Sequence, residues 1–286
     1  MEAFVRQRLS AWRESGDADA QTLAELQAVI EGAMLELAAS GGGVFAKLSS
    51  RSPKDSTIRQ ARAYDLVGAR LAAVKASTQA VTSNDISCAL MCASVQCLRA
   101  RSAAEVMEMF LTSDRVCEDD IPLALEHGHA WSQHIVLREW VDVPPPFEFR
   151  GFVFGDRLTA LSQYFNNGYF PEVVEHRDLV LRLVHDTFDR MRALVPLEPK
   201  EYVVDFAVDV DARRAYVIEL NPFGAPDGMG TGTAMFDLRA PADRETLFGR
   251  APFEFRVETA PSRVSLRTHG HWHAFLEREG YDLKDC

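Results

Sequence analysis

Apolar positions recur along the chain with a helical period in several long segments. Residues 21–39 (QTLAELQAVIEGAMLELAA) place apolar side chains at helical spacing among strong helix formers, which predicts a helix that the glycine run at 41–43 ends. Residues 57–112 are rich in alanine and predict two or three further helices, with a break near residues 82–87. Residues 176–193 predict another amphipathic helix.

Strand-like patterns occupy the segments between these helices. Short apolar runs at 44–48 (VFAKL) and 134–141 (HIVLREWV) predict two strands. Residues 147–165 predict a hairpin that turns at Gly155-Asp156, and residues 201–221 predict a second hairpin. Because helices are mixed with antiparallel hairpins rather than with single parallel strands, the pattern predicts an α+β fold of antiparallel sheets with flanking helices.

The second hairpin carries acidic side chains inside apolar runs. If residues 211–213 form a three-residue loop, Val210 pairs with Arg214. Counting back along both strands then places Asp205 directly opposite Glu219, with about 5 Å between their Cβ atoms. This register is an assumption, because a slip of one residue would turn one of the two side chains to the other face.

Parity brings a third oxygen ligand to the same face. Asn221 lies two residues after Glu219, so both side chains point to the face that carries Asp205. The alternate positions are expected in the core: Val204, Phe206, Val208, Ile218 and Leu220. Two neighbouring carboxylates repel each other unless a cation or a proton lies between them, and magnesium prefers oxygen ligands. The hairpin therefore predicts a magnesium site, and the alternative is a solvated polar strand end.

A lysine and a polar loop form a candidate phosphate site. Lys47 lies inside the apolar run 44–48, where an ammonium group is unfavourable unless an anion meets it. The following loop supplies hydroxyl and cationic donors: Ser49, Ser50, Arg51, Ser52 and Lys54. Such a loop can surround a phosphate group. The alternative is an edge strand whose lysine points to solvent.

Arg150 is a second cation inside an apolar strand. It is a candidate phosphate contact, and the alternative is an ion pair with Glu148 or another acid.

Composition and charge argue against several classes of protein. The chain has 31 Lys+Arg against 42 Asp+Glu, a formal net charge of -11, which opposes nucleic-acid binding and attachment to an anionic membrane as its main functions. It contains no apolar run of about 18 residues, so no membrane span is expected. Its N-terminus lacks the apolar core of a signal peptide. The five cysteines are an odd number without framework spacing, which indicates reduced thiols in a cytoplasmic protein.

Other motifs are weaker. His269, His271 and His273 could bind zinc, but no acid or cysteine cluster completes a site, so a surface or helix-start role is the alternative. GMGTG at 228–232 lacks the strand-then-helix frame of a dinucleotide fingerprint and is interpreted as a mobile loop. The spacing of Cys88 and Cys92 predicts small buried apolar residues on a helix. No nucleophilic set of Ser/His/Asp or Cys/His type is found, so no catalytic residue is assigned.

Taken together and in this order, five segments resemble the cell division cycle protein 123 family, a branch of the ATP-grasp superfamily. The segments are GGVFAKLSSRSPKD (42–55), VLREWVDVPPPFEFRGFV (136–153), RLTALSQYF (157–165), YVVDFAVD (202–209) and VIELNPFG (217–224). The resemblance extends from about residue 40 to residue 238.

The resemblance implies an ATP-grasp-like fold that binds ATP with magnesium. It implies that Asp205, Glu219 and Asn221 hold the metal, in agreement with the hairpin register. It implies an N-terminal helical lobe with the phosphate loop at 1–133 and a core lobe with the hinge and magnesium hairpin at 134–286. The implied nucleotide contacts are Lys47, Ser49, Arg51, Lys54, Arg138, Glu139, Trp140, Val141, Arg150 and Gln163, of which 138–141 form the adenine hinge.

The resemblance also implies a function. In eukaryotes this family helps to assemble translation initiation factor 2 by joining its alpha subunit to its gamma subunit, so the gamma subunit or another protein is the expected partner. Other ATP-grasp proteins activate a carboxylate as an acyl phosphate. An ATP-dependent ligase or phosphotransferase is therefore the alternative.

Overall fold

The structure, a computed structural model, describes residues 17–37, 42–78, 80–130, 132–195, 197–224, 232–261 and 270–281. These residues form a mixed α+β protein that divides into two compact units. Unit 1 comprises residues 1–66 and 93–142, and unit 2 comprises residues 67–92 and 143–286. Among the described residues, no helix has both the length and the apolar character that crossing a membrane requires.

Unit 1 contains a small antiparallel sheet. Strand β1 (Val44–Leu48) pairs with β2 (Arg99–Ala100) on one side and with β3 (Ile135–Glu139) on the other. Buried and half-buried residues alternate along β1, so Val44, Ala46 and Leu48 face the core while Phe45 and Lys47 are half-buried. The predictions of β1 and β3 are confirmed, whereas the two-residue β2 was missed because two residues show no period.

Unit 1 also contains several helical segments. They are α2 (Asp17–Leu37), α5 (Ala103–Leu111), the π-helix η1 (Arg115–Asp120), α6 (Ile121–His127) and the 3-10 turn η2 (Gly128–Ala130). Helix α2 buries Ile30 and Met34 in the same apolar cluster as Val106 and Met109 of α5. Ser102 caps α5, because its Oγ accepts a hydrogen bond of 3.2 Å from the N–H of Glu105.

The Ala-rich segment forms three helices, as predicted. They are α3 (Thr57–Thr78), α4 (Ser83–Gln96) and α5, and the chain breaks between α3 and α4 near the predicted position. Helices α3 and α4 contribute residues to both units. The predicted division lay between residues 133 and 134. The observed unit 1 extends to residue 142, because β3 pairs with β1, and residues 67–92 belong to unit 2.

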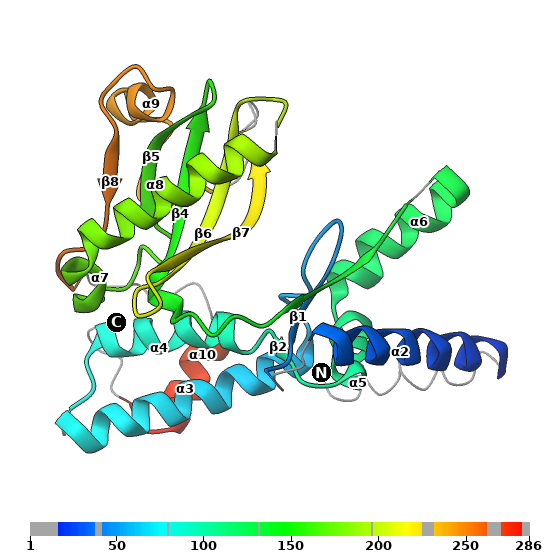
Figure 1. The fold of residues 1–286 in the computed structure, drawn as a ribbon. Helices are drawn as coiled ribbons and strands as arrows, with labels where there is room; N and C mark the ends of the chain where they lie inside the picture. Colours follow the sequence, from blue (N-terminus) through cyan, green and yellow to red (C-terminus); the bar gives the residue numbers. More distant parts are fainter. Residues whose placement is uncertain are drawn as a thin grey trace. The chain divides into compact units, whose positions relative to one another are not determined.

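Unit 2 contains a five-stranded sheet in the order β7-β6-β4-β5-β8 (Figure 1). Its strands are β4 (Glu148–Phe154), β5 (Arg157–Gln163), β6 (Tyr202–Asp209), β7 (Arg214–Pro222) and β8 (Glu254–Arg256). All pairs are antiparallel except β5 with β8, which is parallel. The first hairpin turns at Gly155 (φ 57°) and Asp156 (φ 62°) as predicted, and two positive φ angles are what a type I′ turn requires.

The two faces of this sheet are covered differently. The helical segments of the unit after residue 143 are η3 (Pro145–Phe147), α7 (Pro171–Glu175), α8 (Arg177–Leu194), α9 (Pro241–Leu247) and α10 (Gly270–Arg278). Helix α8 runs across one face and buries Val180, Val184 and Phe188 there (Figure 1). On the other face, Phe236 and Leu247 pack on Phe152, Ala160 and Val203 of the sheet.

The second hairpin differs from its predicted register at the turn. The three-residue loop was wrong: Asp209 pairs with Arg214, so four residues connect the strands. The register then shifts between Phe206, which pairs with Val217, and Asp205, which pairs with Glu219. The extra residue, Ile218, forms a β-bulge that compensates for the longer turn. The predicted Asp205–Glu219 pair is therefore confirmed, although the turn length from which it was predicted was wrong.

The core predicted for this hairpin is confirmed in part. Val204, Phe206 and Val208 are fully buried in the cluster beneath α8. Leu220 is 43% exposed, so its assignment to the core was wrong. The strand β7 lies at the edge of the sheet, where one-sided pairing leaves its last residues accessible to solvent.

Candidate functional site

One polar row crosses all five strands of the unit 2 sheet. The cross-strand register gives the order Glu219, Asp205, Arg150, Ser162 and Arg256, each residue paired with the next. Side chains that face each other in this way have Cβ atoms about 5 Å apart. The row therefore forms a continuous line of polar groups on one face of the sheet.

The row lies on the face opposite α8. Residues adjacent to it along the strands, among them Phe149, Leu161 and Val204, are buried in the cluster that contains α8. Gly151 also belongs to the α8 face, where an added Cβ would approach Leu158 and Phe206 to 2.9 Å. Close packing behind Arg150 therefore explains a glycine at the next position.

Arg150 and Asp205 form a buried ion pair at the centre of the row. Arg150 Nε donates to Asp205 Oδ1 at 2.8 Å and Arg150 Nη2 donates to Asp205 Oδ2 at 2.7 Å. Their side chains are 10% and 3% exposed, respectively. The structure thus contains the ion pair that was the alternative for Arg150, and its partner is Asp205 rather than Glu148.

Two further contacts fix the Arg150 guanidinium. Its Nη1 donates to the carbonyl oxygen of Gly232 at 2.7 Å, and its Cζ lies 4.7 Å from the ring centroid of Tyr164. Burial opposes the charged form, but the hydrogen bonds and charge of Asp205 outweigh it, so the pKa of Arg150 is raised. Burial likewise raises the pKa of Tyr164 and keeps its phenol neutral.

The three predicted metal ligands share one end of the row. Asn221 Nδ2 lies 3.4 Å from Asp205 Oδ2, and Glu219 pairs with Asp205 across the strands. Two carboxylates and an amide are an oxygen donor set that suits magnesium. Within the described part of the chain, no three His, Cys, Asp or Glu side chains group as metal ligands, so the amide and non-protein oxygens would have to complete a coordination sphere.

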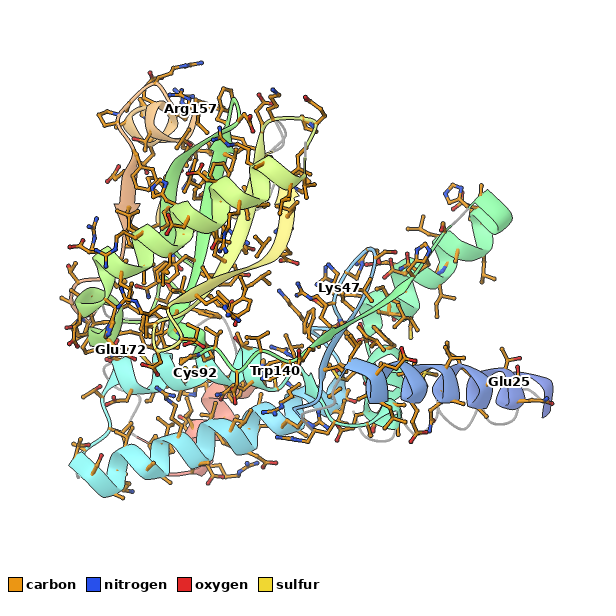
Figure 2. The ribbon with its side chains drawn as sticks, in the orientation of Figure 1. Glu25, Lys47, Cys92, Trp140, Arg157 and Glu172 are labelled. Atoms are coloured by element: carbon orange, nitrogen blue, oxygen red, sulfur yellow. The ribbon has the colours of Figure 1, made fainter. Side chains whose placement is uncertain are left out.

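In unit 1, Lys47 lies on β1 (Figure 2), in a part of the strand that pairs with β3. Its backbone partner is Val136, whereas β2 reaches only Val44 and Phe45. At Lys47 the strand is therefore paired on one side only. This position is compatible with a phosphate contact and with a lysine that points to solvent from an edge strand.

The polar loop after β1 is held mainly by residues far away in the sequence. Ser49 N–H donates to the carbonyl oxygen of His134 at 2.8 Å, and Ser49 Oγ lies 3.2 Å from Gln133 Oε1. Arg51 pairs with Asp119 at 2.6 Å and with the buried Asp120 at 3.1 Å. Two predicted phosphate contacts thus hold this loop against other segments of unit 1.

The neighbouring Lys54 is exposed. The next residue, Asp55, accepts hydrogen bonds from Ser113 Oγ at 2.6 Å and from the N–H of Arg115 at 2.9 Å. The carboxylate after Lys54 therefore fastens the end of the loop.

The predicted adenine hinge, 138–141, begins in the last two residues of β3 and continues beyond it. Arg138 lies over the ring of Phe45 at 5.2 Å, Glu139 is exposed and Val141 is 44% exposed. Trp140 N–H donates to the carbonyl oxygen of Gly43 at 3.0 Å. Within the described residues its indole Nε1 is buried and makes no hydrogen bond.

Gln163 lies in unit 2 and is completely buried. Its Nε2 donates to the carbonyl oxygens of Phe165 and Gly168, both at 2.7 Å, and its Oε1 accepts from the N–H of Glu258 at 3.1 Å. The side chain therefore fixes the loop after β5, and its amide is already well supplied with partners.

Sequence reasoning missed three residues of the row and its surroundings: Ser162, Tyr164 and Arg256. A signal for the last was present, because the pentapeptide PFEFR occurs at 146–150 and again at 252–256. Both copies end in an arginine of the polar row. The second strand has only three residues and pairs in parallel, so neither hairpin arithmetic nor alternation predicted it.

The weaker motifs have mixed outcomes. Cys88 and Cys92 are 6% and 1% exposed, which confirms them as small buried residues, and burial raises the pKa of Cys88 to about 12. His273 Nδ1 lies 3.3 Å from Glu277 on α10. His269 and residues 228–231 lie outside the described residues.

Comparison with known proteins shows the family and the fold of this chain. The family model described as D123 matches residues 88–267, more than half of the chain, and the protein belongs to this family. The solved structure of Cdc123 from Schizosaccharomyces pombe has the same fold, with a TM-score of 0.53 and 22% sequence identity over 82% of this chain and 79% of that one.

Curated relatives agree with this assignment. The cell division cycle protein 123 of Phaeosphaeria nodorum is 27% identical over 74% of this chain and 45% of its own length. The translation initiation factor eIF2 assembly protein of Xenopus laevis is 26% identical over 64% of this chain and 46% of its own length. The chain thus spans less than half the length of each of these relatives.

Proposed function

We propose that this protein binds ATP with magnesium in a site of the ATP-grasp type and acts as an assembly factor for translation initiation factor 2. The observation that carries the nucleotide part is the in-register row in unit 2. It brings Arg150, Asp205 and Glu219 together on one face, with Asn221 beside Asp205.

The donor set fits a magnesium ion chemically. Asp205, Glu219 and Asn221 would hold the ion, which neutralises phosphate charge when it is bound. Arg150 would donate to phosphate oxygens, because its planar guanidinium matches them geometrically. Both oxygens of Asp205 accept from Arg150 in this structure, and a carboxylate has lone pairs left for a cation.

Further candidate contacts lie in unit 1. Lys47, Ser49, Arg51 and Lys54 are the phosphate-side candidates, and the backbone and side chains of 138–141 are the adenine-side candidates. Gln163, in unit 2, acts by holding the loop after β5, because its side-chain amide makes its hydrogen bonds within the protein.

The nucleotide assignment is tested with a conservative variant at Glu219, the half-buried end of the row. We expect ATP to bind wild type in magnesium and more weakly in EDTA, and we expect Glu219→Gln to lose most of this difference. Glu201→Gln, outside the row, is the control. Equal affinities in magnesium and EDTA for wild type would refute the metal site.

The assembly part is supported by the names of the relatives, one of which is an eIF2 assembly protein. We expect the purified gamma subunit of initiation factor 2 to bind this protein, and the alpha subunit to join it more readily in the protein's presence. Joining at an unchanged rate would contradict the assembly role. Release of ADP in step with a covalent product would favour the ligase or phosphotransferase instead.

A further inference from the structure

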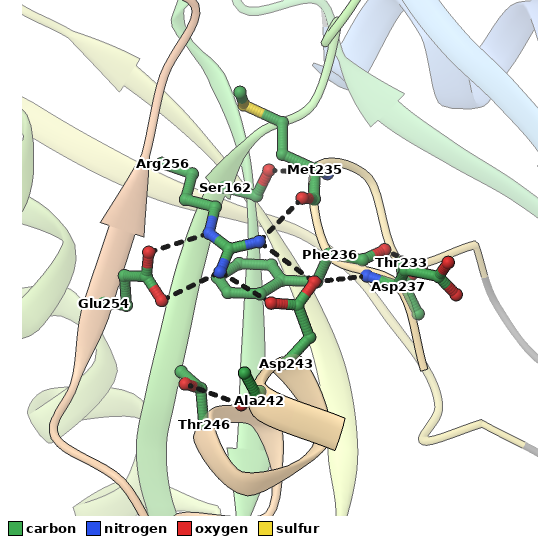
Figure 3. Close-up of polar contacts among 10 residues, drawn as sticks. All are labelled: Ser162, Thr233, Met235, Phe236, Asp237, Ala242, Asp243, Thr246, Glu254 and Arg256. Carbon is green, nitrogen blue, oxygen red and sulfur yellow. Dashed lines mark hydrogen bonds and ion pairs between the residues drawn. The ribbon is translucent and has the colours of Figure 1, made fainter. Parts of the chain in front are cut away.

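The second PFEFR arginine, Arg256, sits in a dense polar cluster (Figure 3). Its Nη1 and Nη2 donate to Asp243 at 3.0 Å and 2.7 Å, and its Nε and Nη2 donate to Glu254 at 2.8 Å and 3.0 Å. Its Cζ lies 4.0 Å from the ring centroid of Phe236, which is 3% exposed. The proposed function uses none of these contacts.

The two arginines of the repeated pentapeptide have matching surroundings. Each pairs with an aspartate through two hydrogen bonds, and each lies over an aromatic ring. Each also donates from Nη1 to a backbone carbonyl of one segment: Arg150 to Gly232 at 2.7 Å and Arg256 to Met235 at 3.0 Å. The segment 232–237 is therefore fastened to both arginines.

The middle of the row fastens the same segment. Ser162 Oγ accepts from the N–H of Met235 at 3.2 Å, and Asp243 Oδ2 accepts from the N–H of Asp237 at 2.7 Å (Figure 3). Asn166 Nδ2 donates to the carbonyl oxygen of Ala234 at 3.0 Å. These contacts fix segment 232–237 over the row, and its Gly232 carbonyl in turn fixes Arg150.

We propose that Arg256 is a positioning residue for the phosphate end of the nucleotide site. It holds segment 232–237, and through the Gly232 carbonyl it sets the position of the Arg150 guanidinium. Arg256 itself does not touch the nucleotide. This inference rests on the proposed function and extends it to a residue outside the assigned ligands.

The chain offers a matched control. Arg250 also pairs with an acid, Glu245 at 3.1 Å, and lies over a phenyl ring, that of Phe248 at 5.4 Å. Its ion pair with Glu245 and its contact with the Phe248 ring do not involve segment 232–237. Arg250→Lys therefore disturbs a weaker ion pair and ring contact of the same kind in the same unit, without releasing the segment.

The test measures the affinity of Arg256→Lys and Arg256→Met for ATP with magnesium and for adenosine, and the hydrogen exchange of amides 233–237. We expect Arg256→Lys to weaken ATP binding by about tenfold, with faster exchange in the segment and little change for adenosine, since the phosphate end alone is disturbed. Arg250→Lys should match wild type in all three. In an Arg150→Lys background, Arg256→Lys should cause little further loss, because the effect passes through Arg150.

The outcomes separate the inference from the proposed function. Unchanged ATP affinity in both Arg256 variants, or equal losses for ATP and adenosine, would overturn the positioning role while leaving the nucleotide site intact. Failure of wild type to bind ATP with magnesium would overturn the proposed function and this inference together. Arg256→Lys keeps the charge, so the test stands even if Arg256→Met does not fold.

Discussion

The polar row of unit 2 and the polar loop of unit 1 contain predicted phosphate or metal contacts of similar chemistry, yet the structure treats them differently. In unit 2 the predicted residues converge, because strand pairing carries Arg150, Asp205 and Glu219 into register. In unit 1, Ser49 and Arg51 bond to residues of distant segments. A sheet therefore specifies a site through its register, whereas a loop specifies one through partners that the local sequence does not reveal.

The largest expected effect is at the buried pair of unit 2. Asp205→Ala leaves the Arg150 guanidinium buried without its carboxylate, so we expect the free energy of unfolding to fall by about 3–5 kcal/mol in urea denaturation. Asp211→Ala, in the exposed turn of the same hairpin, should change it little. Equal stabilities of the two variants would mean that the central pair of the row is dispensable.

Lys47 tests whether unit 1 contributes to the nucleotide site. Lys47→Ala should weaken binding of ATP with magnesium by about 1.5–3 kcal/mol, because a charge-assisted contact is lost. The measurement is calorimetric titration, with the exposed Lys75→Ala on α3 as the control. An unchanged dissociation constant would assign Lys47 to the alternative of a solvent-facing strand lysine.

Arg51 sharpens the comparison, since its contacts hold the loop. Arg51→Met removes the cation beside Asp120, which is 3% exposed, and we expect a loss of about 1–3 kcal/mol in unfolding free energy. The neighbouring exposed Lys54→Met should be nearly neutral. If the two variants were equally stable, the loop would not depend on these ion pairs.

The smallest effect is a pH dependence at the end of the loop. Burial raises the pKa of Asp55, but the hydrogen bonds from Ser113 and Arg115 outweigh it and lower the pKa below its ordinary value of 3.8. A depressed pKa adds stability that is present above 3.8 and is lost as the pH falls below it. The measurement is the thermal unfolding temperature of wild type and of Asp55→Asn from about pH 5 down to below 3.8. We expect this temperature to fall less steeply with decreasing pH in the variant than in wild type. Superimposable profiles would contradict this role.

Regular elements of the fold were predictable from the sequence because their signals are local. The helices of the Ala-rich segment, β1, β3 and the hairpin turn at Gly155-Asp156 follow from periodicity and turn chemistry. Elements of two or three residues, such as β2 and β8, are too short to show a period and form only through their partners.

The site was predictable where one residue fixes the place of another by parity. Asp205, Glu219 and Asn221 were brought together correctly. The observed turn is one residue longer than the predicted one, and the bulge at Ile218 restores the predicted pairing of Asp205 with Glu219. Arg256 was not predictable from hairpin arithmetic, because β8 joins the sheet by a parallel pairing from far along the chain. The repeated pentapeptide PFEFR was the sequence signal that could have identified Arg256. No comparable signal links Arg51 to its partners Asp119 and Asp120.

The most direct test of the central claim is calorimetric titration of ATP, with and without magnesium, into wild type and Asp205→Asn. The amide keeps the shape of Asp205 and removes its charge. The account predicts that wild type binds ATP in a magnesium-dependent manner and that the variant, shown to be folded, loses this dependence. Equal magnesium-dependent binding by the two proteins would contradict the assignment of the polar row as the metal and phosphate site.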